Sequence, residues 1–107
     1  MNTEIWKDIE QYEGLYQVSN FGCVKRLPSF HCKKEHILKP HICSTGYYVV
    51  VLSKNGKTKT HKVHRLVAKA FVPNPHCLNE VSHLDESRTN NFANNLTWCT
   101  PKENNNR

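Results

Sequence analysis

Short strand-like runs alternate with polar turns along most of the chain. Residues 47–53 are rich in aromatic and β-branched side chains, Asn55-Gly56 is a tight-turn pair, and residues 57–63 predict the returning strand. Strand alternation divides the returning side chains between two faces, with Lys57, Lys59 and His61 on one and Thr58, Thr60 and Lys62 on the other. Because both faces are polar, protein alone would bury this strand poorly.

The preceding and following segments predict a further hairpin and one helix. Residues 16–19 and 23–27 are strand-like and flank a turn at residues 20–22, whereas residues 28–46 are predicted to be irregular. Between Val63 and Phe71 the apolar residues recur at helical spacing, so an amphipathic helix is expected there, over residues 64–71.

The C-terminal segment predicts a small unit of two strands and a helix. Short strands at residues 81–84 and 95–98 enclose a polar loop, and Thr100 followed by Pro101 is typical of a helix start. Together these elements predict an α+β fold built from small antiparallel β-hairpins.

Charge is concentrated in the middle of the sequence. Hydrophobic residues make up 37% of the 107 residues, which predicts one small core, and the formal net charge is +6. Residues 14–79 carry eleven Lys or Arg against Glu35 alone, whereas residues 80–107 are nearly neutral. This distribution indicates a nucleic-acid partner. The alternatives are a solvated surface and an edge strand protected from aggregation by Lys.

The chain holds five cysteines, and neither a Cys-x-x-Cys pair, a signal peptide nor a membrane-spanning run is found in the sequence. We therefore expect a reduced, cytoplasmic setting. One local cluster combines the two metal-binding residue types: His31, Cys32, His36, His41 and Cys43. Its spacing fits no standard zinc pattern, so a structural zinc protein is the weakest of the alternatives.

The order of polar residues in the C-terminal segment resembles the HNH endonucleases, whose site is a ββα-metal (His-Me) finger. The segments His-Leu-Asp at 83–85, Thr-Asn-Asn at 89–91, Asn-Leu-Thr-Trp at 95–98 and Thr-Pro-Lys-Glu-Asn at 100–104 follow the family order. Residues 4–24 are similar to the N-terminal module of phage and intron-encoded members. The resemblance implies a nuclease-associated DNA-binding module at 1–46 and an HNH nuclease domain at 47–107, with the finger at 80–107.

The resemblance also implies an activity, which is metal-dependent hydrolysis of DNA phosphodiester bonds to a 5′-phosphate and a 3′-hydroxyl. His83 is the expected general base, and Asn95 is expected to tie the loop to the finger and fix the orientation of His83. One Mg²⁺ or Mn²⁺ ion per site is expected on Asn104 and Ser82. Ser82 departs from the family, which often has Asp there, and Glu86 departs from a common Gly.

Other residues are expected to bind DNA or to support the site. The predicted DNA contacts are Lys25, Arg26, Lys57, Lys59, Lys62, Arg65 and Arg88. The predicted structural residues are Asp85, Asn90, Asn91, His64 and Trp98. Because the sequence ends about one turn into its last predicted helix, we expect a monomer that nicks double-stranded DNA in a bacterial or phage-infected cell. No small-molecule cofactor or membrane partner is expected, and a catalytically weakened DNA-binding protein is the main alternative.

Overall fold

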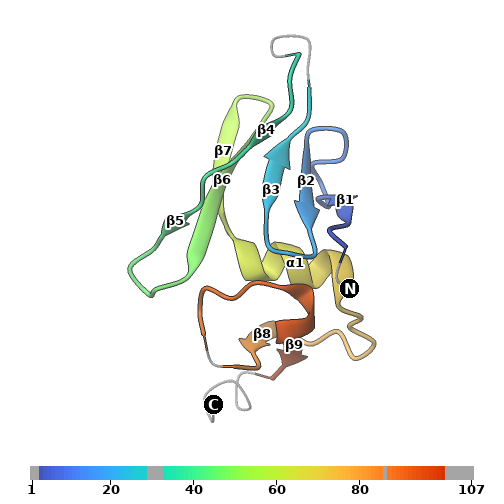
Figure 1. The fold of residues 1–107 in the computed structure, drawn as a ribbon, viewed down its shortest axis with the longest axis vertical. Coiled ribbons are helices and arrows are strands. Elements are labelled where there is room, and N and C mark those ends of the chain that lie inside the picture. Colours follow the sequence, from blue (N-terminus) through green and yellow to red (C-terminus); the bar gives the residue numbers. More distant parts are fainter. Residues whose placement is uncertain (1–2, 29–32, 86, 101–107) are drawn as a thin grey trace.

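The computed structural model describes residues 3–28, 33–85 and 87–100, which form three antiparallel sheets and one α-helix (Figure 1). The first sheet has the order β1 (Trp6–Asp8), β2 (Tyr16–Ser19), β3 (Val24–Arg26) and β4 (His36–Ile37). The second has the order β5 (His41–Ile42), β6 (Tyr48–Lys54) and β7 (Lys57–Lys62). The third pairs β8 (Glu80–His83) with β9 (Leu96–Cys99).

The β6–β7 hairpin follows the sequence prediction closely. Asn55 and Gly56 both have positive φ angles, 54° and 77°, as a two-residue turn between right-twisted strands requires. In the register Leu52 lies opposite Lys59 and Val51 opposite Thr60. The predicted alternation of the β7 side chains is therefore confirmed, with Leu52 buried on one face of the sheet and Val51 exposed on the other.

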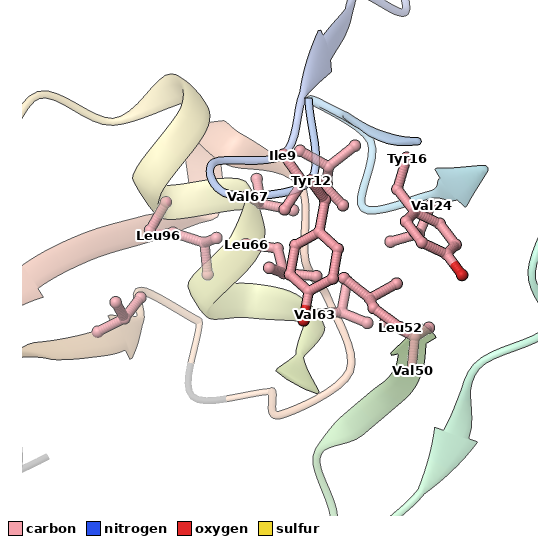
Figure 2. Close-up of a cluster of buried hydrophobic side chains, with 13 residues drawn as sticks. Ile9, Tyr12, Tyr16, Val24, Val50, Leu52, Val63, Leu66, Val67 and Leu96 are labelled. Carbon is pink, nitrogen blue, oxygen red and sulfur yellow. The ribbon is translucent and has the colours of Figure 1, made fainter. Parts of the chain in front are cut away.

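Helix α1 (Val63–Phe71) follows β7 directly and lies between the two larger sheets and the β8–β9 hairpin (Figure 1). Its apolar stripe is buried as the 3.6-residue spacing predicts, and the chain leaves the helix at Val72, one residue before Pro73. The hydrophobic core surrounds this helix. Figure 2 shows Leu66 and Val67 of α1 with Leu96 of β9 on one side and Tyr16 and Val24 on the other.

The core joins both halves of the sequence. Val18 of β2, Leu52 of β6 and Val67 of α1 are each 0% exposed and belong to one buried cluster. The Tyr16 hydroxyl accepts a hydrogen bond from the backbone N–H of Ser53 at 3.1 Å, which ties the first sheet to the second. The packing is therefore continuous across residue 46. The predicted division into a DNA-binding module and a nuclease domain at that position is one of function, and it stays a prediction.

Three strands were not predicted. Residues 28–46 were expected to be irregular, but they contain β4 and β5, and β1 also lay outside the predicted strands. These strands are two or three residues long, which is too short for an alternating pattern to be recognised in sequence. The helix predicted from Pro101 lies outside the described residues. No helix within the described ranges is long and apolar enough to cross a membrane.

Candidate active site

His83 occupies the last position of β8 and faces a buried polar cluster. The strand pairs with β9 in a register that sets His83 opposite Leu96, and His83 is only 5% exposed. Beyond His83 the chain enters a loop that returns through a 3-10 turn, η1 (Ala93–Asn95), and closes when the Leu84 N–H donates to the Asn95 carbonyl at 2.7 Å. The hairpin thus brings His83 against the side chains of its own loop.

Asn95 holds that loop together. Its amide nitrogen donates to Asp85 Oδ1 at 3.0 Å and to the Asn90 carbonyl at 2.9 Å, while its oxygen accepts from the Asp85 N–H at 3.2 Å. Asn90 also donates to Asp85 Oδ2, and this bond, together with the Ser87 N–H and Asn95, lowers the pKa of the Asp85 carboxyl below its ordinary value. The loop-supporting roles predicted for Asp85, Asn90 and Asn95 agree with this geometry.

Asn91, rather than Asn95, bonds to His83. The distance from His83 Nε2 to Asn91 Oδ1 is 2.8 Å, and both side chains are buried. The Asn95 amide is used within the loop, so its predicted effect on the orientation of His83 would be indirect and stays a prediction. Because an amide oxygen only accepts hydrogen bonds, this contact favours the tautomer with the proton on His83 Nε2 and the free lone pair on Nδ1.

Two further rings enclose His83. The ring of Tyr47 lies 5.9 Å from that of His83, with an angle of 25° between the planes, and the ring of His64 lies 5.0 Å from it. His64 comes from the first turn of α1 and is 4% exposed, and its Nδ1 has no hydrogen-bond partner. Burial, with smaller contributions from His83, Lys62 and Arg65, lowers the pKa of His64 to about 3. His64 is therefore neutral at physiological pH, and its predicted structural role agrees with this position.

Two predicted DNA contacts meet at Tyr47. Lys62 Nζ lies 5.1 Å from the centre of the Tyr47 ring, and the Arg88 guanidinium lies 5.3 Å from it. Arg88 also donates to the carbonyl of Thr45. Lys62 and Arg88 are both exposed, so the pair places positive charge beside the ring that packs on His83.

The other residues predicted to contact DNA differ in whether their side chains already have partners within the fold. Arg26, Lys57 and Lys59 are exposed, as a phosphate contact requires. Lys25 lies 3.3 Å from Glu35 and 4.4 Å from the centre of the Trp6 ring. Arg65 donates to the Asn79 carbonyl at 2.9 Å and lies 3.8 Å from Glu80. Lys25 and Arg65 therefore take part in contacts within the fold, and their roles in DNA binding stay predictions.

The described residues do not form a complete metal site. Within these ranges no group of three or more His, Cys, Asp or Glu is arranged to hold a metal ion. Asn104, the expected ligand from the last helix, lies outside them, as do Glu86, His31 and Cys32. Ser82 is 4% exposed and offers one neutral hydroxyl, which is a weak ligand for a hard cation.

Trp98 anchors the finger to the helix. Its ring packs against the core cluster, and its Nε1–H donates to the carbonyl of Val72 at the end of α1, at 3.0 Å. The predicted structural role of Trp98 agrees with this contact. Tyr47 and the hydrogen bond of Asn91 were not anticipated. For Asn91 the Asn90-Asn91 pair was a usable signal, whereas nothing in the sequence marks Tyr47 as part of the site.

The sequence of this chain is similar to those of known proteins. Residues 4–53 match the model of the NUMOD4 motif. The chain is 44% identical over 99 residues to the DNA endonuclease I-HmuI of Bacillus phage SP01, covering 92% of this chain and 54% of that protein. It is 30% identical over 105 residues to the H-N-H endonuclease F-TflII of Escherichia phage T5, covering 96% and 51%.

A solved structure matches the fold as well. The structure described as DNA binding and cleavage by the HNH homing endonuclease I-HmuI superposes with a TM-score of 0.81 at 44% identity, over 95% of this chain and 56% of that one. The match confirms both the predicted resemblance and the predicted fold class. The chain spans about half the length of these relatives.

Proposed function

Because the chain is a homologue of the HNH endonucleases with a NUMOD4 motif in its N-terminal half, we propose that it cleaves double-stranded DNA. The reaction is hydrolysis of a phosphodiester bond, with His83 as general base. Water forms the new P–O bond, the bond from phosphorus to the 3′-oxygen breaks, and the products are a 5′-phosphate and a 3′-hydroxyl. We propose that the protein works as a monomer and nicks one strand, in the cytoplasm of a bacterial or phage-infected cell.

The hydrogen bond between His83 and Asn91 carries this proposal. It spans 2.8 Å, commits Nε2 as the donor, and leaves Nδ1 as the basic nitrogen that takes a proton from water. The reaction then needs little movement of His83, because the rings of Tyr47 and His64 hold the imidazole in a buried position. Asn95 supports the same geometry indirectly by fixing the loop that contains Asn91.

Positive charge beside the site suits a phosphate substrate. Lys62 and Arg88 lie over Tyr47, and His64 is neutral, with a pKa of about 3, so the neighbouring histidine adds no second proton-binding group at neutral pH. We propose that these two cations bind phosphates flanking the scissile bond, and that Arg26, Lys57 and Lys59 extend the contact surface.

We also propose that catalysis requires one divalent cation per site, Mg²⁺ or Mn²⁺. The resemblance to the HNH endonuclease family implies this requirement, whereas Ser82 is the single predicted ligand among the described residues. When bound, such an ion supplies positive charge that stabilises the phosphorane-like transition state.

The test is relaxation of supercoiled plasmid across a metal panel. We expect nicked circles with Mg²⁺ or Mn²⁺, no product with EDTA, and a loss of roughly 10²- to 10⁴-fold in rate for His83→Ala. His76→Ala is the matched control, because His76 is an exposed histidine outside this cluster. Equal rates for the two variants would rule out His83 as the base. Direct appearance of linear DNA at low enzyme concentration would contradict nicking by a monomer.

A DNA-binding protein with weakened catalysis is the second candidate, and Ser82 favours it. A buried hydroxyl stands where the resemblance to the HNH family leads us to expect a carboxylate before the histidine. Under this candidate the wild-type chain binds DNA in a salt-sensitive manner but cleaves slowly, and Ser82→Asp increases cleavage by about tenfold or more. Because Ser82 is 4% exposed, the new carboxylate would also make thermal stability depend on Mg²⁺. A Ser82→Asp protein without either change removes support for this candidate.

A further inference from the structure

A tight turn in the N-terminal half packs against the residues that follow Asn91. The turn comprises residues 20–22 and joins β2 to β3, and it is called here the 20–22 turn. Its carbonyl at Asn20 accepts a hydrogen bond from the Ala93 N–H at 2.8 Å. Next to this bond, the rings of Phe21 and Phe92 stack with their centres 4.8 Å apart and their planes 17° from parallel.

Gly22 makes the closest approach. A Cβ atom at this position would lie 2.8 Å from the Cβ of Asn91 and 3.1 Å from its carbonyl oxygen, so no side chain fits without displacing Asn91. Gly22 also has a φ of 87°, which glycine adopts readily. The turn is thus shaped to bring its backbone against Asn91, whose side chain hydrogen-bonds to the His83 ring.

The 20–22 turn is itself fixed to the first sheet. Ser19 is 0% exposed, and its hydroxyl oxygen accepts hydrogen bonds from the N–H groups of Phe21 and Cys23, both at 3.1 Å. The side-chain oxygen of Asn20 accepts from the Ile5 N–H at 2.8 Å. A turn held in this way has one conformation, so it provides a rigid surface for Asn91.

We propose that the 20–22 turn is a positioning element for His83, acting through Asn91. Gly22 fixes the location of the Asn91 backbone, and the Asn91 amide oxygen then holds the proton on His83 Nε2 and keeps Nδ1 basic. If Asn91 moves, the imidazole is free to exchange to the other tautomer, in which Nδ1 carries the proton and cannot accept one from water. The N-terminal half would therefore control the competence of the base as well as any contact with DNA.

The inference rests on the proposed nuclease function for its kinetic consequences, but the tautomer of His83 is measurable without activity. The test compares Gly22→Ala with Gly14→Ala in the full chain. Gly14 has a φ of 77°, and a Cβ placed there would meet nothing within 4 Å, so its substitution introduces the same backbone strain without the contact to Asn91. Phe21→Ala serves as a milder variant if Gly22→Ala folds poorly, and Asn91→Ala removes the last link.

Imidazole ¹⁵N NMR reports the tautomer, and plasmid cleavage reports the rate. We expect His83 to carry its proton on Nε2 in the wild type and in Gly14→Ala. Gly22→Ala, Phe21→Ala and Asn91→Ala should show a mixture of tautomers, with kcat reduced about 10- to 100-fold in Asn91→Ala and KM for DNA nearly unchanged.

The proposal is overturned if Gly22→Ala and Gly14→Ala give the same tautomer signature, or if the wild type has the proton on Nδ1. A wild-type chain that cleaves no DNA under any metal condition refutes the proposed function instead. In that case the NMR comparison still decides whether the 20–22 turn positions His83.

Discussion

His64 should make the folded state sensitive to acid. Its side chain is 4% exposed, its Nδ1 has no hydrogen-bond partner, and its pKa is lowered to about 3 from an ordinary value of 6.5. Burial is the main cause, and electrostatic repulsion from His83, Lys62 and Arg65 further disfavours a positive charge on His64. The folded protein therefore keeps His64 neutral at a pH where the unfolded chain binds a proton.

The magnitude follows from the two pKa values. Because the unfolded state binds more protons between pH 6.5 and about 3, stability falls as the pH is lowered through this range and is unaffected by His64 above it. From pH 8 to pH 5 the loss due to His64 is about 2 kcal/mol. This value depends mainly on the unfolded pKa, so a folded pKa one unit higher would change it very little.

Urea unfolding of the wild type and of His64→Gln at pH 8 and pH 5 isolates this effect. Glutamine does not titrate, so comparing how the free energy of unfolding of the two proteins changes with pH cancels the contributions of all other ionisable groups. These groups include His61, because burial lowers the pKa of that side chain as well. We expect the wild type to lose about 2 kcal/mol more than His64→Gln between these pH values. Equal losses within about 0.5 kcal/mol would refute the reasoning, because His64 would then be accessible to protons in the folded state.

Three further predictions concern the core, the loop and the DNA surface. Leu52→Ala, at a position that is 0% exposed, should lower the free energy of unfolding by about 3 kcal/mol, measured by urea denaturation. Asn95→Ala should raise the pKa of Asp85 toward its ordinary value, measured by NMR titration, because it removes a donor to that carboxylate. Lys62→Gln and Arg88→Gln should each reduce the slope of log K against log salt concentration for DNA binding by about 0.9; an unchanged slope would exclude a phosphate contact.

The larger elements of the fold were predictable because their signals are local. The β6–β7 hairpin depends on the Asn55-Gly56 pair, and α1 depends on apolar spacing, and both features act over fewer than about ten residues. The strands β1, β4 and β5 were missed because each pairs through two or three residues, where the partner rather than the sequence determines the conformation.

The site was predictable in part for a different reason. His83 and Asn95 were recognised because their order and spacing resemble a family, and Asp85 and Asn90 because short polar side chains stabilise loops. The contacts of Tyr47 with His83 and of Gly22 with Asn91 are tertiary: each depends on which distant segment packs nearby, and sequence spacing does not encode that distance. The structural role predicted for His64 agrees with its buried position, but its lowered pKa could be inferred only from that burial.

The contacts around His83 come from both halves of the chain. The matched motif ends at residue 53, yet it contains Tyr47, whose ring packs on His83, and Gly22, which packs against Asn91. The C-terminal hairpin supplies the imidazole and its amide partner, but the surfaces that hold them lie in the N-terminal half and in α1. An isolated finger would leave the His83 ring without the contacts of Tyr47 and His64, which restrict its orientation. The position of the His83 imidazole is thus a property of the packed chain, which the C-terminal sequence pattern alone does not specify.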